Sequence, residues 1–270
     1  TAVISICRFS GEGWDRKDVD FYLTEEEKKL VENVKKRFPK VAVVLNVGGM
    51  VDTSWFKDDA GILSALLAWQ GGMEGGLAAA ELLCGICSPS GKLSDTFAVN
   101  FEAYPSSANF HESDAYVEYT DDIYVGYRYF ETIPGAAEKV NYEFGYGLSY
   151  TEFEWTKPEM TCLGNAAAGD PIVAVSTVTN VGSCEGKEVL QLYGSAPDGV
   201  LGKAKKHLLA FEKTRLLKPG ESQKVSFTFS LKDMASYDDL GKIEKSAYLL
   251  EAGTYQFYFG NSVRHVEKMD

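Results

Sequence analysis

A single carboxylate between two glycines is the first feature of this sequence that could carry out chemistry. Glu12 stands in Ser10-Gly11-Glu12-Gly13-Trp14-Asp15-Arg16, directly after an apolar run at residues 2–7 that is typical of a strand buried on both faces. The glycines permit backbone angles that other residues resist, so the carboxylate can project from a tight loop. Ligands of open parallel sheets bind beyond the carboxyl ends of the strands, where we expect this loop. The alternative is an ordinary strand-to-helix turn with a solvated glutamate.

The segments after this loop predict a parallel α/β unit. Thr24 and Glu27 have the spacing of a capping box, which predicts the start of a helix. The apolar residues that follow fall on one face of this helix, which should end before Pro39. Further strands are expected at residues 41–45 and 62–69, and a helix at about 71–86. Strand, helix and strand in this order imply a right-handed parallel crossover. The glycines at 71–76 do not have the G-x-G-x-x-G spacing, so a nucleotide-binding loop is the weaker interpretation.

The second half of the sequence has a different pattern. Small residues at 164–169 indicate a linker, and alternating apolar and polar residues then predict short strands with turns at 218–221 and 251–253. About seven short strands in roughly a hundred residues are typical of an immunoglobulin-like sandwich. We expect strands at the following ranges: 173–179, 188–193, 208–211, 224–229, 246–250 and 254–259.

Composition narrows the classes of partner and cofactor. Lysine and arginine number 27 and the acidic residues 39, so the net charge of −12 argues against nucleic acid. No apolar run approaches the ~20 residues of a membrane span. Five cysteines at irregular spacing are not a disulfide framework, and the pair Cys84 and Cys87 is expected to be buried rather than to bind a metal. Three scattered histidines offer little to a zinc or Ser-His-Asp enzyme, so we expect no cofactor and no metal.

Several sequence blocks together resemble family-three glycoside hydrolases, the β-glucosidase group. The loop at Ser10–Arg16 is similar to the acid/base loop of that family. The other similar blocks follow in the family's order across nearly the whole chain: Val41–Gly48, Ala68–Gly76, Ser88–Leu93, Ile123–Phe130 and Tyr142–Tyr150. The resemblance implies an α/β/α sandwich domain, here incomplete, followed by a fibronectin type III-like module.

The resemblance also implies a reaction. Glycosidic cleavage needs two carboxyl groups, and the family uses a retaining mechanism with a covalent glycosyl intermediate. It places the general acid/base on Glu12, with Ser10 and Trp14 as candidate substrate contacts. The nucleophile of the family is an aspartate on a (β/α)8 barrel of about 250 residues, for which this chain has no room. We therefore expect a partner barrel in the same polypeptide or in a second chain, and a terminal β-D-glucosyl or related residue as substrate.

These interpretations give a division of the chain and an expected role. We expect residues 1–114 to be the C-terminal part of an α/β sandwich domain, 115–168 an aromatic-rich connecting segment and 169–270 a fibronectin type III-like β-sandwich. The chain alone should be inactive. The competing function is a non-catalytic module that binds carbohydrate or protein, and self-association stays open. The unpatterned cysteines favour the cytoplasm, but the sequence opens at Thr1 like a trimmed start, which leaves secretion or the periplasm open.

Overall fold

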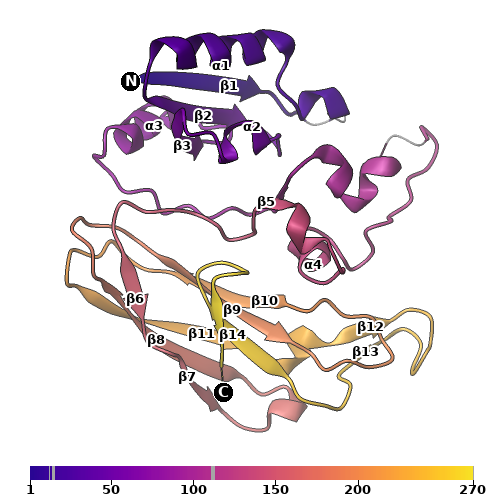
Figure 1. The fold of residues 1–270 in the computed structure, drawn as a ribbon. Coiled ribbons are helices and arrows are strands. Elements are labelled where there is room, and N and C mark those ends of the chain that lie inside the picture. The colour runs from indigo at the N-terminus through magenta and orange to yellow at the C-terminus, as the bar shows by residue number, and fades with distance from the viewer. Residues whose placement is uncertain (12, 14–15, 111–112, 270) are drawn as a thin grey trace. The chain divides into compact units, whose positions relative to one another are not determined.

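The computed structural model describes residues 1–11, 13, 16–110 and 113–269. The chain forms two compact units, and each of them is assembled from three separate stretches (Figure 1). Unit 1 consists of Thr1–Ile86, Phe97–Thr120 and Glu138–Tyr142, and unit 2 of Cys87–Thr96, Asp121–Ala137 and Glu143–Asp270.

Unit 1 is built on a three-stranded parallel sheet, which confirms the predicted α/β fold. The strands β1 (Ala2–Arg8), β2 (Val41–Val47) and β3 (Ile62–Leu67) pair in the order β1-β2-β3. The third strand ends at Leu67 and not at Trp69 as expected from sequence. Trp69 has a φ of +51°, which is outside the extended region, so the ladder cannot continue through it.

The helix α1 (Glu25–Arg37) covers one face of this sheet. Its predicted capping box is present: the Glu27 N–H donates to Thr24 Oγ1 at 3.2 Å and the Thr24 N–H donates to Glu27 Oε2 at 2.8 Å. Val31 of this helix packs with Ile4, Ile6 and Val43 in the core of unit 1. Two other apolar residues of this segment, Leu30 and Phe38, are 47% and 41% exposed.

The structure contradicts two expectations about burial. Strand β1 is buried on one face only: Ile4 and Ile6 are buried, whereas Val3 is 55% exposed and Cys7 is exposed. The helix α3 (Gly75–Leu83) has no buried residue, and Cys84 and Cys87 beyond it are exposed rather than buried. For β1 the side chains alternate along the strand, so Val3 and Cys7 lie on the face away from α1. The part of the chain that the structure describes provides no full cover for the side of the sheet opposite α1.

Short elements complete unit 1. The helix α2 (Ser54–Lys57) contributes Phe56 to the core. The short strand β4 (Phe97–Ala98) pairs with β5 (Val140–Tyr142). Among the described residues no helix has both the length and the apolar character needed to span a bilayer.

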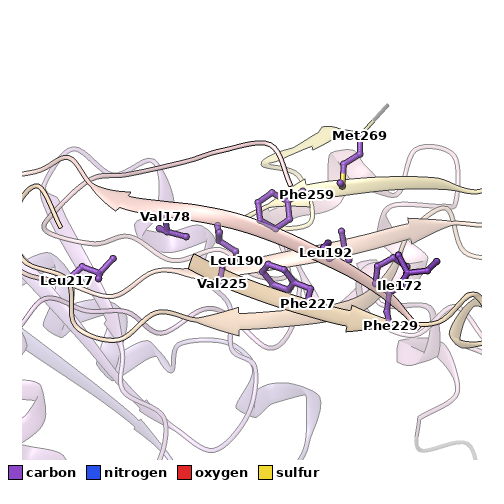
Figure 2. Close-up of a cluster of buried hydrophobic side chains, with 11 residues drawn as sticks. Ile172, Val178, Leu190, Leu192, Leu217, Val225, Phe227, Phe229, Phe259 and Met269 are labelled. Carbon is purple, nitrogen blue, oxygen red and sulfur yellow. The ribbon is translucent and has the colours of Figure 1, made fainter. Parts of the chain in front are cut away.

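Unit 2 is an antiparallel β-sandwich, as the second half of the sequence predicted. Figure 2 shows its core, in which Leu190 and Leu192 of one sheet meet Val178 and Phe227 of the other. One sheet has the order β10-β9-β14-β15 and the other β11-β8-β6, with β7 also paired to β8. The bounds are β8 (Ile172–Asn180), β9 (Val189–Ser195), β10 (His207–Lys213), β11 (Ser222–Phe229), β14 (Gln256–Gly260) and β15 (Val266–Lys268).

Two strands of the sandwich lie in the stretch that the sequence presented as a connection. Strands β6 (Phe153–Trp155) and β7 (Glu159–Cys162) are antiparallel to β8. Each has only three or four residues, so the alternation that identifies a strand hardly develops. Unit 2 also contains a two-stranded antiparallel sheet, β12 (Ser236–Asp238) with β13 (Ala247–Leu249). The short helix α4 (Tyr127–Phe130) belongs to the same unit.

The segment 87–96 belongs to unit 2 although unit 1 residues flank it on both sides. Leu93 pairs through its backbone with Tyr146 and Gly145, at 2.8 Å in each hydrogen bond. Lys92 forms an ion pair of 2.9 Å with Glu188, and both side chains are nearly buried. This segment therefore supplies the charge partner of a buried glutamate in the sandwich.

Candidate active site

The carboxyl ends of the three parallel strands bring together the segments that the sequence singled out. The loop after β1 carries Ser10, the turn after β2 contains Gly48, and the segment after β3 contains Gln70. In an open parallel sheet this edge is the usual place for a ligand. The predicted substrate contact Ser10 is half-buried there, whereas Glu12 and Trp14 lie outside the described residues.

Gly48 is the point at which the three segments meet. A methyl group on its α-carbon would lie 2.4 Å from Ser10 Cβ and 2.8 Å from Gln70 Cδ, so only glycine fits between these side chains. Its backbone N–H also donates to the Arg8 carbonyl at 3.0 Å. Arg8 and Ser10 thus lie directly against the turn after β2. On the other side of Glu12, Gly13 has a φ of +91°, a region that favours glycine.

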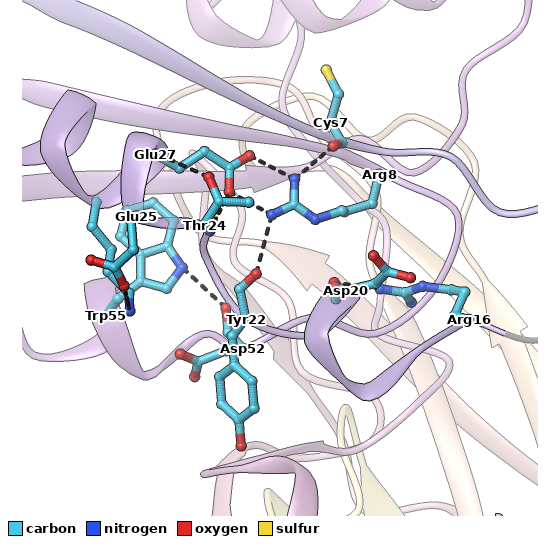
Figure 3. A network of polar contacts seen from close by, with 11 residues as sticks. Cys7, Arg8, Arg16, Asp20, Tyr22, Thr24, Glu25, Glu27, Asp52 and Trp55 are labelled. Carbon is cyan, nitrogen blue, oxygen red and sulfur yellow. Dashed lines mark hydrogen bonds and ion pairs between the residues drawn. The ribbon is translucent and has the colours of Figure 1, made fainter. Parts of the chain in front are cut away.

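Arg8 fixes the base of this loop at the end of β1 (Figure 3). Its guanidinium donates to both carboxylate oxygens of Glu27, at 2.6 Å and 2.5 Å, and to the carbonyls of Cys7 and Tyr22 at 2.8 Å and 3.1 Å. The hydrogen bonds from Arg8 lower the pKa of Glu27, and those to Glu27 raise the pKa of Arg8. Glu27 therefore joins the strand end to the capping box of α1. The sequence did not predict this contact, because the two residues are 19 positions apart and no local pattern relates them.

Arg16 holds the far side of the same loop. Its Nη1 donates to the Met50 carbonyl and its Nη2 to the Asp20 carbonyl, each at 2.9 Å. Burial lowers the pKa of Arg16, while the negative charge of Asp20 raises it. The Asp20 carboxylate in turn accepts from the Lys17 N–H at 3.0 Å. Asp15, the residue before Arg16, lies outside the described residues.

The segment after β3 contributes a residue that the sequence did not single out. The left-handed backbone of Trp69 turns the chain, and its ring packs near Phe97 with 6.3 Å between ring centroids. Gln70 follows with an exposed side chain that makes no hydrogen bond to any residue that the structure describes. Its amide can both donate and accept, as a sugar hydroxyl requires. The only signal in the sequence was its position beyond a predicted strand.

The described carboxylates around the loop have structural roles. Glu27 is held by Arg8, and Asp20 caps the short turn Asp18–Asp20. Glycosidic cleavage needs one carboxyl group to donate a proton and another to stabilise or attack the anomeric carbon. Glu12, the predicted acid/base, lies outside the described residues. Within the described ranges no group of three acidic, histidine or cysteine side chains is placed to bind a metal.

Comparison with known proteins finds two family domains along the chain. Residues 1–150 match the Glycosyl hydrolase family 3 C-terminal domain, and residues 188–263 match the Fibronectin type III-like domain. Beta-glucosidase A of Butyrivibrio fibrisolvens is 56% identical over 304 residues, which cover 100% of this chain and 37% of that protein. Beta-glucosidase of Ruminococcus albus is 42% identical, with 99% of this chain and 28% of the relative covered.

Solved structures are similar over almost the full length of the chain. A β-glucosidase from Paenibacillus barengoltzii has a TM-score of 0.94 at 46% identity, covering 99% of this chain and 29% of that one. Beta-glucosidase 3B of Thermotoga neapolitana, solved with α-D-glucose, has a TM-score of 0.87 at 39% identity, covering 99% and 36%. The chain thus spans about a third of the length of these relatives. It belongs to glycosyl hydrolase family 3, of which it carries the C-terminal domain and the fibronectin type III-like domain.

Proposed function

We propose that this chain is the part of a retaining β-glucosidase that supplies the general acid/base, Glu12. The observation that carries the proposal is that Ser10 and Arg16, which flank Glu12 in the sequence, both contact the turn after β2 at the carboxyl edge of the parallel sheet, Ser10 at Gly48 and Arg16 at Met50. Relatives that are named β-glucosidases support the substrate class. The substrate in this proposal is a glycoside or oligosaccharide with a terminal β-D-glucosyl or related residue.

The proposal assigns the nucleophile to another part of the enzyme. The chain covers 37% of its Butyrivibrio relative, so most of that protein has no counterpart here. We place the nucleophilic aspartate on a (β/α)8 barrel in that remainder, in the same polypeptide or in a second chain. Glu12 then protonates the leaving oxygen in the first step and removes a proton from water in the second. Ser10 and Trp14 are the proposed substrate contacts on this side of the site.

The proposal is tested by replacing Glu12 with glutamine in the complete enzyme. Glutamine keeps the shape and removes the proton donor, so glucosides with poor leaving groups should react about 100- to 10,000-fold more slowly. Aryl glucosides with good leaving groups need little protonation and should lose less in the glycosylation step. Azide should then rescue the second step and give a β-glucosyl azide. Equal losses for all leaving groups, with no effect of azide, would exclude Glu12 as the acid/base.

The isolated chain offers an independent check. Without a nucleophile it should not turn over an aryl β-glucoside, and steady turnover by material whose intact mass is that of this chain alone would contradict the division of labour. Binding of glucose or cello-oligosaccharides by the isolated chain, measured by calorimetry, would instead favour the competing function of a carbohydrate-binding module.

A further inference from the structure

Both flanks of the Glu12 loop rest on the same short turn after β2. Before Glu12, Ser10 touches Gly48 so closely that a methyl group there would lie 2.4 Å from Ser10 Cβ. After Glu12, Arg16 donates to the carbonyl of Met50 at 2.9 Å. Only five residues, 11–15, separate Ser10 from Arg16 in the sequence. The described residues on either side of Glu12, Ser10 and Arg16, therefore both contact residues 48–50.

The guanidinium of Arg16 makes two hydrogen bonds in different directions, which a lysine ammonium cannot make with the same geometry. It bonds two carbonyls from separate segments at once, Met50 after β2 and Asp20 in the turn after the loop. A planar guanidinium presents several N–H groups in fixed directions, whereas an ammonium is a single nitrogen on a flexible chain. Arg16 therefore ties the end of the Glu12 loop to two fixed points together.

Gly49 provides the space that this contact needs. A methyl group on Gly49 would lie 2.5 Å from Arg16 Nη1, which is closer than a carbon and a nitrogen can approach. Two consecutive glycines thus accept the two flanks of the loop, Gly48 accepting Ser10 and Gly49 accepting Arg16. A loop closed at both ends has fewer conformations than one fixed at a single end.

We propose that Arg16 is a positioning residue for the general acid/base, acting through its bonds to Met50 and Asp20 rather than by touching substrate. The inference rests on the proposed function, because it needs Glu12 to transfer the proton. A misplacement of about 1 Å at a reacting group can cost on the order of 100-fold in rate. The effect of losing Arg16 should appear in the proton-transfer step, with little effect on binding of the glucosyl ring.

The test uses the complete enzyme with Arg16→Lys, which keeps the charge and loses the fork. We expect kcat/KM to fall about 10- to 100-fold for an alkyl β-glucoside, which needs the acid, and less than about 3-fold for dinitrophenyl β-glucoside. The KM for the alkyl β-glucoside should change little. Arg215→Lys is the matched control, because Arg215 makes an exposed ion pair of 2.7 Å with Glu221, and it should leave both substrates unaffected.

Three further variants make the outcomes decisive. Gly49→Ala keeps Arg16 but displaces its Nη1, so it should show the same dependence on the leaving group. This variant takes the place of Arg16→Lys if Arg16→Lys folds poorly. Glu12→Gln with Arg16→Lys should be no slower on the alkyl glucoside than Glu12→Gln alone. Equal losses of Arg16→Lys on both substrates, or additive losses in the double variant, would overturn the positioning role. A Glu12→Gln variant that itself lacks the leaving-group dependence would refute the proposed function, and the positioning role with it.

Discussion

The ion pair between Arg8 and Glu27 should contribute strongly to the stability of unit 1, and Glu27→Gln isolates its charge. The glutamine side-chain oxygen can still accept from the Thr24 N–H, so the capping hydrogen bond, 2.8 Å in the wild type, can still form. The two side chains are only 14% and 21% exposed. Breaking a fully buried pair costs about 3–5 kcal/mol, and exposed pairs contribute about 0–1 kcal/mol. For this partly buried, doubly hydrogen-bonded pair we expect a loss of about 2 kcal/mol in the free energy of unfolding.

The dependence on pH gives a second readout with a definite sign. Hydrogen bonds from Arg8 lower the pKa of Glu27 from its ordinary value of 4.5. A carboxylate with a lowered folded-state pKa stabilises the protein fully above its unfolded pKa, and this contribution is lost as the pH falls through the folded value. The difference between wild type and Glu27→Gln should therefore be constant from pH 7 to about pH 5 and shrink below about pH 4.

The assay is urea unfolding of this chain, followed in unit 1 by hydrogen exchange of peptides from α1 and β2. Glu25→Gln is the matched control, because Glu25 pairs with Lys28 on the same helix at 2.7 Å but with side chains 73% and 54% exposed. It should cost less than about 0.5 kcal/mol. A Glu27→Gln loss no larger than that of Glu25→Gln, or a difference that does not change between pH 7 and pH 3, would refute the reasoning.

Three other substitutions have definite expectations. Gly48→Ala places a methyl group 2.4 Å from Ser10 Cβ, so it should lower the free energy of unfolding of unit 1 by about 1–3 kcal/mol, measured by thermal unfolding. It should also lower the rate of glucoside hydrolysis by the complete enzyme. Glu188→Gln leaves the nearly buried Lys92 without its counter-charge and should destabilise unit 2 by about 3 kcal/mol in urea unfolding, whereas Glu185→Gln on the same segment should not. Burial, aided by Arg128, lowers the pKa of His207 from 6.5, so the folded state binds fewer protons than the unfolded one. Stability should therefore fall as the pH drops below about 6.5, and His207→Gln should reduce this slope; an unchanged slope would contradict the assignment.

Local patterns in the sequence were enough for the framework of unit 1. The capping box of Thr24 and Glu27 and the apolar strands identified α1, β1 and β2, because these signals depend on residues a few positions apart. Burial was predicted less well. The apolar character of β1 suggested cover on both faces, but which face is covered depends on elements far away in the chain.

The contacts that hold the candidate site were not accessible from the sequence. Arg8 and Glu27 are 19 residues apart, and Arg16 and Met50 are 34 apart, so only the fold brings them together. The left-handed backbone of Trp69 has no local signal either, because such angles are unusual for a bulky side chain. The role of Glu12 stays a prediction that depends on its family and on the position of its loop.

The alternation of the chain between the two units limits how the protein can be cut. A fragment beginning at residue 150 or 169 would contain most of the β-sandwich but would lack Lys92 and the backbone pairing of Leu93. Glu188 would then lose its ion-pair partner and keep only the hydrogen bonds from the Val189 N–H and Asn261 Nδ2, which we expect to destabilise the sandwich by about 1–3 kcal/mol. The sandwich is therefore poorly suited to excision or to transfer between proteins as an independent module. During synthesis its packing can be completed only with a segment that emerged from the ribosome before most of its strands.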